Sequence, residues 1–595
     1  MFLGAHQAVA AQNLNVFIAD HYGAGTAVSK ITTNPSTAML GAGGYFLCTS
    51  TSDPKCATSA TMTALLPICK SASEANCVES LAVTSPKAAN GEALLIKTIG
   101  KKAFEADPIS GTPAGASWSL FEVPELKRAG EQSLYAVNVS VSFQKFPIVG
   151  FKATDFSAAV VPYTLGTTSS ADPHPEEYVD PTGKTSVRGL GGDPKCVWIE
   201  SGSCGVEATF PNDARVKLTV HVGNYLTSWL HGRLTDPNIS ISAIDTQQNR
   251  LSVDANPVTV PAASTAQPVN ALDPNLVNRF RDPNGNLPSG DLSMLVESSQ
   301  STAMDSFATY EKFFSNKANR LDSVWSFRAL GASAAASMVP AGPSSLPSSP
   351  TGILGAITGM LGSGTSSPTT AIADALGMGV AAAKCSSQIS AVTGAILGNN
   401  SSTALIGLVT TNAMTYDAKP PQFKDGSLDY KVAGLHLNPD DTVFSGRYDL
   451  VMDSKVARCL YGYSDSNAPL QATVEIIDAD GTTKVTTSNL RESNGWLKLG
   501  VYGFSFSSPT LKVKLVQGTP VVNPQTPPPA STPASTPANT PANTPANTPA
   551  STPASTPAAT GVKAPMKTIS CVKGKTIKKV TGANPKCPAG FKLKP

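Results

Sequence analysis

The stretch Tyr135-Ala-Val-Asn-Val-Ser-Val-Ser-Phe143 indicates the fold class of this chain. Apolar side chains occupy every second position, and the positions between them hold small or polar residues. This period of two is typical of a β-strand with one buried face. The stretch Arg215-Val-Lys-Leu-Thr-Val-His-Val222 repeats the pattern and predicts a second such strand, with His221 on the face away from the core.

Shorter runs continue the strand pattern further along the chain, and Asp-Pro steps indicate turns. The runs lie at 239–244, 251–260, 428–432, 474–476 and 511–515. Because helices do not alternate with these runs, antiparallel sheets are expected and parallel ones are not. The sequence therefore predicts a multidomain, mainly β protein built of antiparallel sandwich-like units.

Two adjoining segments depart from the β pattern. In 291–328 the apolar residues recur at helical spacing, which predicts a long amphipathic helix or a helix pair facing the core. The segment 329–416 contains only two charged residues, Asp374 and Lys384, and is rich in Gly, Ala and Ser. Its Gly355-Ala-Ile-Thr-Gly359 matches the spacing that lets helices approach closely. We expect a helical insert, and a membrane-active hairpin is the alternative.

A period-four repeat of Thr-Pro-Ala with Ser or Asn runs through 527–560. Such a segment cannot bury a core, so we expect a disordered Pro-rich stalk of extended conformation. The expected organisation is an N-terminal Cys-containing region (1–80), a β-sandwich-like domain (81–262), a helical segment with the insert (263–416), a second β-sandwich-like domain (417–520), a Thr/Pro/Ala stalk (521–562) and a basic two-Cys module (563–595).

Eight of the 10 cysteines form close pairs along the chain, with the C-x7-C spacing three times, and Cys385 and Cys459 are left to pair over a longer distance. An even number of cysteines at this spacing predicts disulfides, since metal sites favour C-x2-C. The connectivity stays open, and buried free thiols are the alternative. The disulfide candidates are Cys48 with Cys56, Cys69 with Cys77, Cys196 with Cys204, Cys385 with Cys459 and Cys571 with Cys587. Disulfides require an oxidising compartment, so we expect a secreted or cell-surface protein.

Two further features bear on export. Ala8-Val-Ala-Ala11 resembles the small-residue end of a signal peptide, although no basic region and no full apolar region precede it. No uninterrupted stretch of about 18 apolar residues occurs, so no membrane-spanning helix is expected.

The charge of +3 conceals a contrast along the chain. Residues 561–595 contain nine Lys and no Asp or Glu, so the rest of the chain sums to −6. Such an end predicts an anionic partner, either a cell-wall polymer or the envelope surface. Nucleic acid is not expected, because the end lacks Arg and nucleic-acid motifs. The predicted polyanion-binding residues are Lys573, Lys575, Lys578, Lys579, Lys586, Lys592 and Lys594. A solubilising tail is the alternative.

The C-terminal stretch Met566-Lys-Thr-Ile-Ser-Cys-Val-Lys-Gly-Lys-Thr-Ile-Lys-Lys-Val580, followed by Asn584-Pro-Lys-Cys-Pro-Ala-Gly-Phe-Lys592, resembles a short Lys-rich two-Cys module of exported proteins from aquatic actinobacteria. The segments Leu428-Asp-Tyr-Lys-Val432 and Gly495-Trp-Leu497 are also similar to large, uncharacterised exported proteins of that group. The resemblance implies an exported protein with a C-terminal module, and it implies no catalytic residue.

Three groups of residues are candidates for chemistry. His221 and His231, with Trp229 between them, could line a ligand groove, but an exposed strand face and a turn at 230–233 are favoured. Asp282, Asn284 and Asn286 match the start of a calcium loop, yet Leu287 replaces its Gly, so a turn is favoured. The loop from Asp172 to Asp180, with His174, Glu176 and Glu177, could hold paired carboxylates, and a solvated acidic loop is favoured.

No catalytic motif is recognisable, and the sequence predicts no catalytic residue, metal or cofactor. The leading hypothesis is an exported cell-surface binding or structural protein, retained at the envelope by its basic end. The alternatives are an extracellular polysaccharide hydrolase and a membrane-active protein acting through 352–414.

Overall fold

The computed structural model describes most of the chain in two separate units, Met1–Val521 and Val522–Pro595. The described residues are 12–20, 28–33, 45–57, 59–100, 102–146, 150–179, 183–223, 227–245, 248–281, 284–297, 303–330, 404–417, 421–463, 470–477, 483–487, 489–506, 510–517, 567–573, 576–582 and 592–593. The insert at 331–403 and the stalk lie outside these residues. The prediction of a mainly β protein with several sheets is confirmed.

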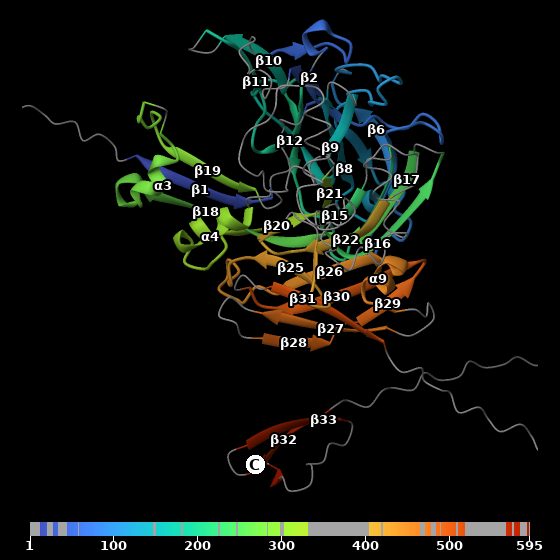
Figure 1. The fold of residues 1–595 in the computed structure, drawn as a ribbon, viewed down its shortest axis with the longest axis vertical. Helices are drawn as coiled ribbons and strands as arrows, with labels where there is room; N and C mark the ends of the chain where they lie inside the picture. Colours follow the sequence, from blue (N-terminus) through green and yellow to red (C-terminus); the bar gives the residue numbers. More distant parts are fainter. Residues whose placement is uncertain are drawn as a thin grey trace, which may run out of the picture. The chain divides into compact units, whose positions relative to one another are not determined.

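A 15-stranded sheet runs through the first unit (Figure 1). Its path is β29 (Asn489–Ser493), β30 (Trp496–Phe504), β26 (Gly446–Asp453), β22 (Ala404–Thr411), β15 (Thr227–Arg233), β21 (Ser326–Leu330), β9 (Gly150–Thr167), β8 (Leu134–Phe146), β4 (Ala60–Leu65), β2 (Lys30–Thr33) and β3 (Leu47–Cys48). Branches are β12 (Cys196–Glu200), β13 (Ser203–Glu207), β6 (Leu94–Thr98) and β7 (Ser119–Glu122). The quoted stretch 135–143 lies in β8, with Val139 and Val141 buried.

Two smaller sheets share cores with this long sheet. One comprises β16 (Thr235–Ala243), β17 (Gln248–Asn256), β14 (Arg215–Gly223) and β5 (Cys77–Thr84). The other comprises β23 (Thr415–Tyr416), β25 (Ser427–Ala433), β31 (Thr510–Gln517), β27 (Leu470–Ile477) and β28 (Thr483–Thr487), with β24 (Gln422–Lys424) on β25. Leu218 of the first sheet shares a buried cluster with Val139, and Val513 of the second shares one with Leu450. Each small sheet thus forms a sandwich with part of the long one.

The long sheet joins residues that the sequence assigns to separate domains. β9 and β8 come from 81–262, whereas β26 and β30 come from 417–520, yet β21, β15 and β22 connect them by continuous pairing. β22 lies in the segment expected to be helical. Its Ala-Leu-Ile-Gly-Leu-Val run has no polar face, because a central strand is buried on both sides. The expected boundaries at 262 and 417 therefore have no counterpart in the strand pairing.

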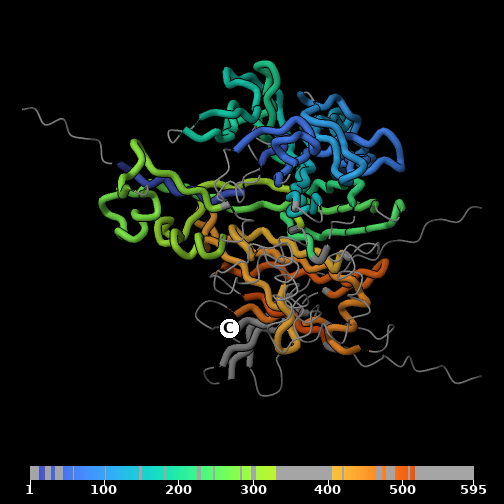
Figure 2. Tube along the Cα trace, turned by 45° about the horizontal axis from the view of Figure 1, so that its top comes forward, coloured from blue at the N-terminus to red at the C-terminus, as the bar shows by residue number. Residues whose placement is uncertain are grey.

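A separate four-stranded sheet contains the first strand of the chain (Figure 1, Figure 2). Its order is β19 (Leu292–Glu297), β1 (Asn13–Ala19), β18 (Val258–Pro268) and β20 (Arg320–Val324). β1 lies between β18 and β19. It pairs with β18 in antiparallel and with β19 in parallel orientation. Leu14, Val16 and Ile18 on one face of β1 are fully buried in the core of this sheet.

The prediction of one long helix or a helix pair over 291–328 is wrong for most of that range. Its residues form β19, α4 (Ala303–Tyr310), η3 (Glu311–Phe313), β20 and β21. Ser315 and Asn316 adopt left-handed backbone conformations directly after η3, which ends the helix. The helical spacing also fits short strands, and pairing with distant β1, β18 and β9 selects the strands.

The remaining helices of the described residues are short, and the described residues of the second unit form a small sheet. The helices are η1 (Pro54–Cys56), α2 (Pro124–Arg128), η2 (Val269–Ala271), α3 (Pro274–Asn278) and α9 (Ser454–Leu460). The sheet of the second unit has the order β33 (Thr576–Gly582), β32 (Lys567–Lys573) and β34 (Lys592–Leu593). Within the described part of the chain, no helix is long and apolar enough to cross a bilayer.

Candidate functional site

Three of the predicted disulfides are formed: Cys48–Cys56, Cys69–Cys77 and Cys196–Cys204. In each, the cysteines are eight residues apart and close a short loop. Cys459 is also disulfide-bonded. Cys385 and Cys587 lie outside the described residues.

The basic module brings lysine positions together through strand pairing. β32 and β33 pair so that Lys578 stands opposite Cys571 and Lys579 opposite Ser570, and β34 places Lys592 opposite Val572. Lys573 ends β32 opposite Thr576. Lys575, Lys586 and Lys594 lie outside the described residues.

Beside the Cys69–Cys77 disulfide, cross-strand register gathers four residues from three strands. His221 on β14 stands opposite Cys77 on β5 and opposite Arg250 on β17. Glu79 is the extra residue of a β-bulge in β5, because the register with β14 shifts between Thr219 and Val220. A bulge re-aims the side chain that it carries. Here the Glu79 carboxylate reaches both His221 and Arg250.

Both ring nitrogens of His221 face oxygen acceptors. Nε2 lies 2.9 Å from Oε2 of Glu79, and Nδ1 lies 2.6 Å from the carbonyl oxygen of Glu74. Burial acts to raise the pKa of Glu79, but hydrogen bonds from Arg250 and His221 outweigh it and lower that pKa, so the carboxylate is charged. Neither oxygen donates, so each ring nitrogen must carry a hydrogen for both bonds to form. Both ring nitrogens thus lie within hydrogen-bonding distance of an oxygen acceptor.

The same ring contacts the disulfide. Nδ1 of His221 lies 3.7 Å from Sγ of Cys69 and 3.6 Å from Sγ of Cys77. These three side chains could in principle hold a metal ion, because their ligand atoms lie within 4.8 Å of one another. Metals require thiolates, and here the two sulfur atoms are bonded to each other. The expectation that His221 lies on an exposed strand face is wrong, since its side chain is only 1% exposed.

His231 is likewise buried, and the expected turn at 230–233 is wrong because these residues end β15. The ring stacks between Tyr416 and Tyr430, and Nδ1 lies 3.2 Å from the Tyr430 hydroxyl. Burial, with a smaller effect of the Arg328 charge, lowers the pKa of His231 to about 3. The Trp229 side chain is buried in the cluster around β26, away from the strands that surround His221. The two histidines therefore do not line a shared groove.

Arg233 forms a buried connection between distant parts of the chain. Its guanidinium pairs with Asp20 at 2.7 Å and stacks on the Tyr416 ring at 4.6 Å. It also donates to the carbonyl oxygens of Thr411 and Met414. The carboxylate and the carbonyls satisfy a charge that is only 1% exposed. This arrangement fixes the end of β1 against the loop after β22.

Asp449 is a buried acid in the sandwich around β26. Its Oδ1 accepts a hydrogen bond of 2.6 Å from the Tyr502 hydroxyl, and its Oδ2 accepts one of 3.2 Å from Thr235. Gly500 stands opposite Asp449 in β30, where a Cβ would lie 2.5 Å from the Tyr502 hydroxyl. Burial raises the pKa of Asp449 to about 7, although both hydrogen bonds act to lower it.

The acidic segment after Asp172 forms a hairpin of β10 (His174–Val179) and β11 (Thr185–Leu190). Glu176 pairs with Arg188, while Glu177 pairs with Lys55 and accepts a hydrogen bond from the Leu47 amide. Adjacent residues of a strand point to opposite faces, so these glutamates do not form a carboxylate pair. His174 Nδ1 contacts the Asp172 carbonyl. Asp180 lies outside the described residues.

The residues that match the start of a calcium loop, where a turn is expected, are only partly described. Asp282 lies outside the described residues, while Asn284 and Asn286 flank Gly285. Arg281 donates to the Gly285 carbonyl at 2.6 Å, so a cation already occupies one backbone acceptor of this turn.

No protein-family model matches the chain, and a search of curated proteins finds no significant match. The resemblance to exported actinobacterial proteins therefore stays an expectation. Sequence patterns did not indicate the His221 cluster, because its members are far apart along the chain. The C-x7-C spacing around Cys69 was the one local signal at this place.

Proposed function

We propose that this is an exported cell-surface binding or structural protein, which its basic C-terminal module holds on an anionic cell-wall polymer or envelope surface. One observation carries the proposal: 561–595 has nine Lys and no acidic residue, in a chain with a charge of only +3. Lysines without neighbouring acids attract polyanions. In the sequence, the period-four repeat lies between the body and the module.

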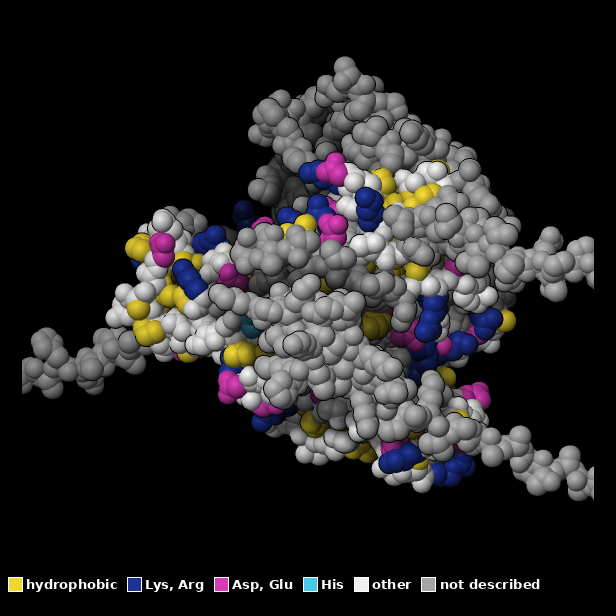
Figure 3. Space-filling view, turned by 90° about the horizontal axis from the view of Figure 1, so that it is seen from below, with side chains coloured by type: hydrophobic (Ala, Val, Ile, Leu, Met, Phe, Trp, Pro, Cys, Tyr) yellow, Lys and Arg dark blue, Asp and Glu magenta, His cyan; other side chains and the backbone are white. Residues whose placement is uncertain are grey.

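The charges on the body are consistent with attachment through the C-terminal module alone. On the face shown in Figure 3, Lys and Arg side chains alternate with Asp and Glu side chains among the described residues. Among the described residues of the body, ion pairs join basic and acidic side chains, for example Arg215 with Asp254 and Lys512 with Asp429. Mixed charges of this kind give little attraction to a polyanion. The disulfides support the compartment, because such bonds persist in oxidising surroundings.

The observations favour the proposed role over both alternatives. For a hydrolase, Glu176 and Glu177 were the expected acids, and both are engaged in separate ion pairs. For a membrane-active hairpin, part of 352–414 is β22, a central strand of the long sheet. Neither alternative has an observation of its own in its favour.

The test measures retention of the full chain on the cells that make it. Cells carrying the full chain or a chain without 561–595 are washed with increasing NaCl, and the released protein is quantified. We expect the shortened chain to leave at low salt and the full chain at high salt, because weak ionic contacts add through valency and are screened by salt.

Matched substitutions separate charge from shape. The seven predicted lysines are replaced together by Gln in one variant and by Arg in another. The Arg variant should be retained like the natural chain and the Gln variant should be lost. Equal retention of all the chains, or loss of the Arg variant, would contradict an ionic attachment.

A further inference from the structure

We propose that Cys69–Cys77 is a thiol–disulfide exchange site, at which an external dithiol reduces this bond selectively with the help of His221. This inference is independent of the C-terminal attachment. It rests on two observations that distinguish this disulfide from the other two described ones with the same C-x7-C spacing.

The first observation is access to sulfur. Cys69 is half-buried, while Cys77 is fully buried. In the other two disulfides all four cysteines are buried, with exposed fractions of 8% for Cys48, 0% for Cys56, 2% for Cys196 and 0% for Cys204. Exchange requires a thiolate to reach one sulfur atom in line with the bond. Among these six cysteines Cys69 is the least buried, so the attack is assigned to its sulfur.

The second observation is the charge beside the sulfur that would leave. The His221 ring has its Nδ1 3.6 Å from Sγ of Cys77, and its two nitrogens bond to acceptors as an imidazolium does. A neighbouring imidazolium stabilises a thiolate, and a more stable thiolate leaves faster. The Glu74 carbonyl oxygen lies 3.3 Å from Sγ of Cys77 and can accept a hydrogen bond from the thiol product.

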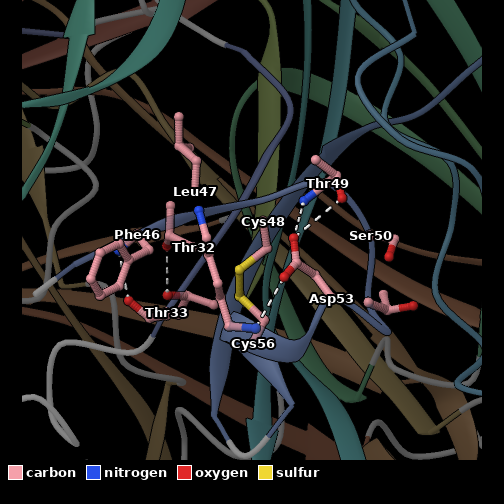
Figure 4. The surroundings of a disulfide bond; sticks show 12 residues. Thr32, Thr33, Phe46, Leu47, Cys48, Thr49, Ser50, Asp53 and Cys56 are labelled. Atoms are coloured by element: carbon pink, nitrogen blue, oxygen red, sulfur yellow. Dashed lines mark hydrogen bonds between the residues drawn. A yellow bond between two sulfur atoms is a disulfide. The ribbon is translucent and has the colours of Figure 1, made fainter. Parts of the chain in front are cut away.

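The surroundings of Cys48–Cys56 differ in charge (Figure 4). There the Asp53 carboxylate lies beside the disulfide and accepts hydrogen bonds from the Thr49 amide and hydroxyl. Those two hydrogen bonds, with one from the Lys55 amide, lower the pKa of Asp53, so this group is an anion. An anion opposes the formation of a thiolate nearby, whereas the imidazolium of His221 favours it.

The reaction has two steps. A thiolate of the dithiol attacks Sγ of Cys69, the Cys69–Cys77 bond breaks, and its electron pair goes to Sγ of Cys77, which becomes a thiol with a proton from the reagent. The second thiol of the reagent then attacks the reagent's own sulfur in the mixed disulfide. The sulfur of Cys69 leaves and takes up a proton. The reagent leaves as its cyclic disulfide, and Cys69 and Cys77 end as two thiols. Two electrons and two protons pass from the dithiol to the protein.

The test compares the three disulfides within the full folded chain. Dithiothreitol at limiting concentration is added without denaturant, thiols are blocked with iodoacetamide over time, and tryptic peptides are quantified by mass spectrometry. We expect Cys69 and Cys77 to be alkylated about tenfold or more faster than the other four cysteines. Equal rates for the three disulfides would overturn the proposal.

A monothiol reports the direction of attack. Glutathione followed by iodoacetamide should leave glutathione on Cys69 and the alkyl group on Cys77. Trypsin cleaves after Lys70, between the two cysteines, so their peptides are separate. Glutathione predominantly on Cys77 would contradict the proposed roles of the two sulfur atoms.

Two variants test the part played by the ring. His221→Gln should slow reduction of Cys69–Cys77 about tenfold and leave the other two disulfides unchanged, which also shows that the fold is intact. If all three disulfides become labile in His221→Gln, that variant is misfolded. Glu79→Gln then tests the role of the ring in its place. This second variant keeps the ring but removes the carboxylate that accepts from Nε2 and favours the protonated form of the ring, so it should slow the same disulfide selectively. If Cys69–Cys77 is reduced in the folded variant as fast as in the natural protein, the proposed role of His221 is wrong.

Discussion

Replacing Asp449 with Asn removes a buried carboxyl group that titrates near neutral pH. The side chain is 4% exposed and accepts hydrogen bonds from Tyr502 and Thr235. Burial raises its pKa from 3.8 to about 7, so the folded protein holds a proton that the unfolded chain has already released. The folded state therefore binds more protons than the unfolded state between these two pH values.

The sign and size of the effect follow from this difference. Where the folded state binds more protons, the free energy of unfolding falls as the pH rises. The stabilising contribution of the protonated acid is complete below pH 4 and is lost as the pH rises through about 7. At about 1.4 kcal/mol per pH unit, the loss amounts to about 4 kcal/mol. The amide that replaces the carboxyl group does not titrate, and it can donate to Thr235 while its oxygen accepts from Tyr502.

The assay is urea unfolding of the full chain and of Asp449→Asn from pH 4.5 to 8.5, followed by tryptophan fluorescence. We expect the variant to gain about 3–4 kcal/mol relative to the natural protein across this range. Asp213→Asn is the matched control, because Asp213 is exposed and its left-handed backbone conformation suits Asn. If the free energy of unfolding changes with pH in the same way for the natural protein and for Asp449→Asn, the reasoning is wrong.

Two further predictions concern the region where β15 meets β22. The pKa of His231 falls to about 3 on burial, so the unfolded chain binds a proton that the folded protein excludes, and stability is lost as the pH falls below 6.5. In His231→Gln, the part of this loss that comes from His231, about 3 kcal/mol between pH 6.5 and 4, should disappear. The midpoint of urea unfolding should therefore depend less on pH than in the natural protein. Arg233→Met leaves Asp20 buried without its ion pair and should destabilise the protein by about 3–5 kcal/mol. Combining it with Asp20→Asn should restore part of that loss in the same assay, and strict additivity of the two changes would show that the pair is not coupled.

Local patterns of the sequence determine much of this protein. The alternation in 135–143 and 215–222 is visible without any partner, because the period of two belongs to the strand itself. The three C-x7-C spacings identify three disulfides, since a loop of eight residues brings its own ends together. The excess of lysine after residue 561 is a matter of composition alone.

The tertiary structure decides which strands meet and what their register assembles. β1 pairs with β18 and β19, which lie more than 200 residues further along the chain, and no local pattern encodes that choice. His221 is opposite Cys77 and Arg250 only because β14 lies between β5 and β17, and a one-residue bulge turns Glu79 toward the ring. A strand pattern states which side chains share a face, whereas the neighbour across the sheet depends on long-range packing. The strands and disulfides could therefore be predicted from the sequence, while the shared long sheet and the histidine ring beside one disulfide could not.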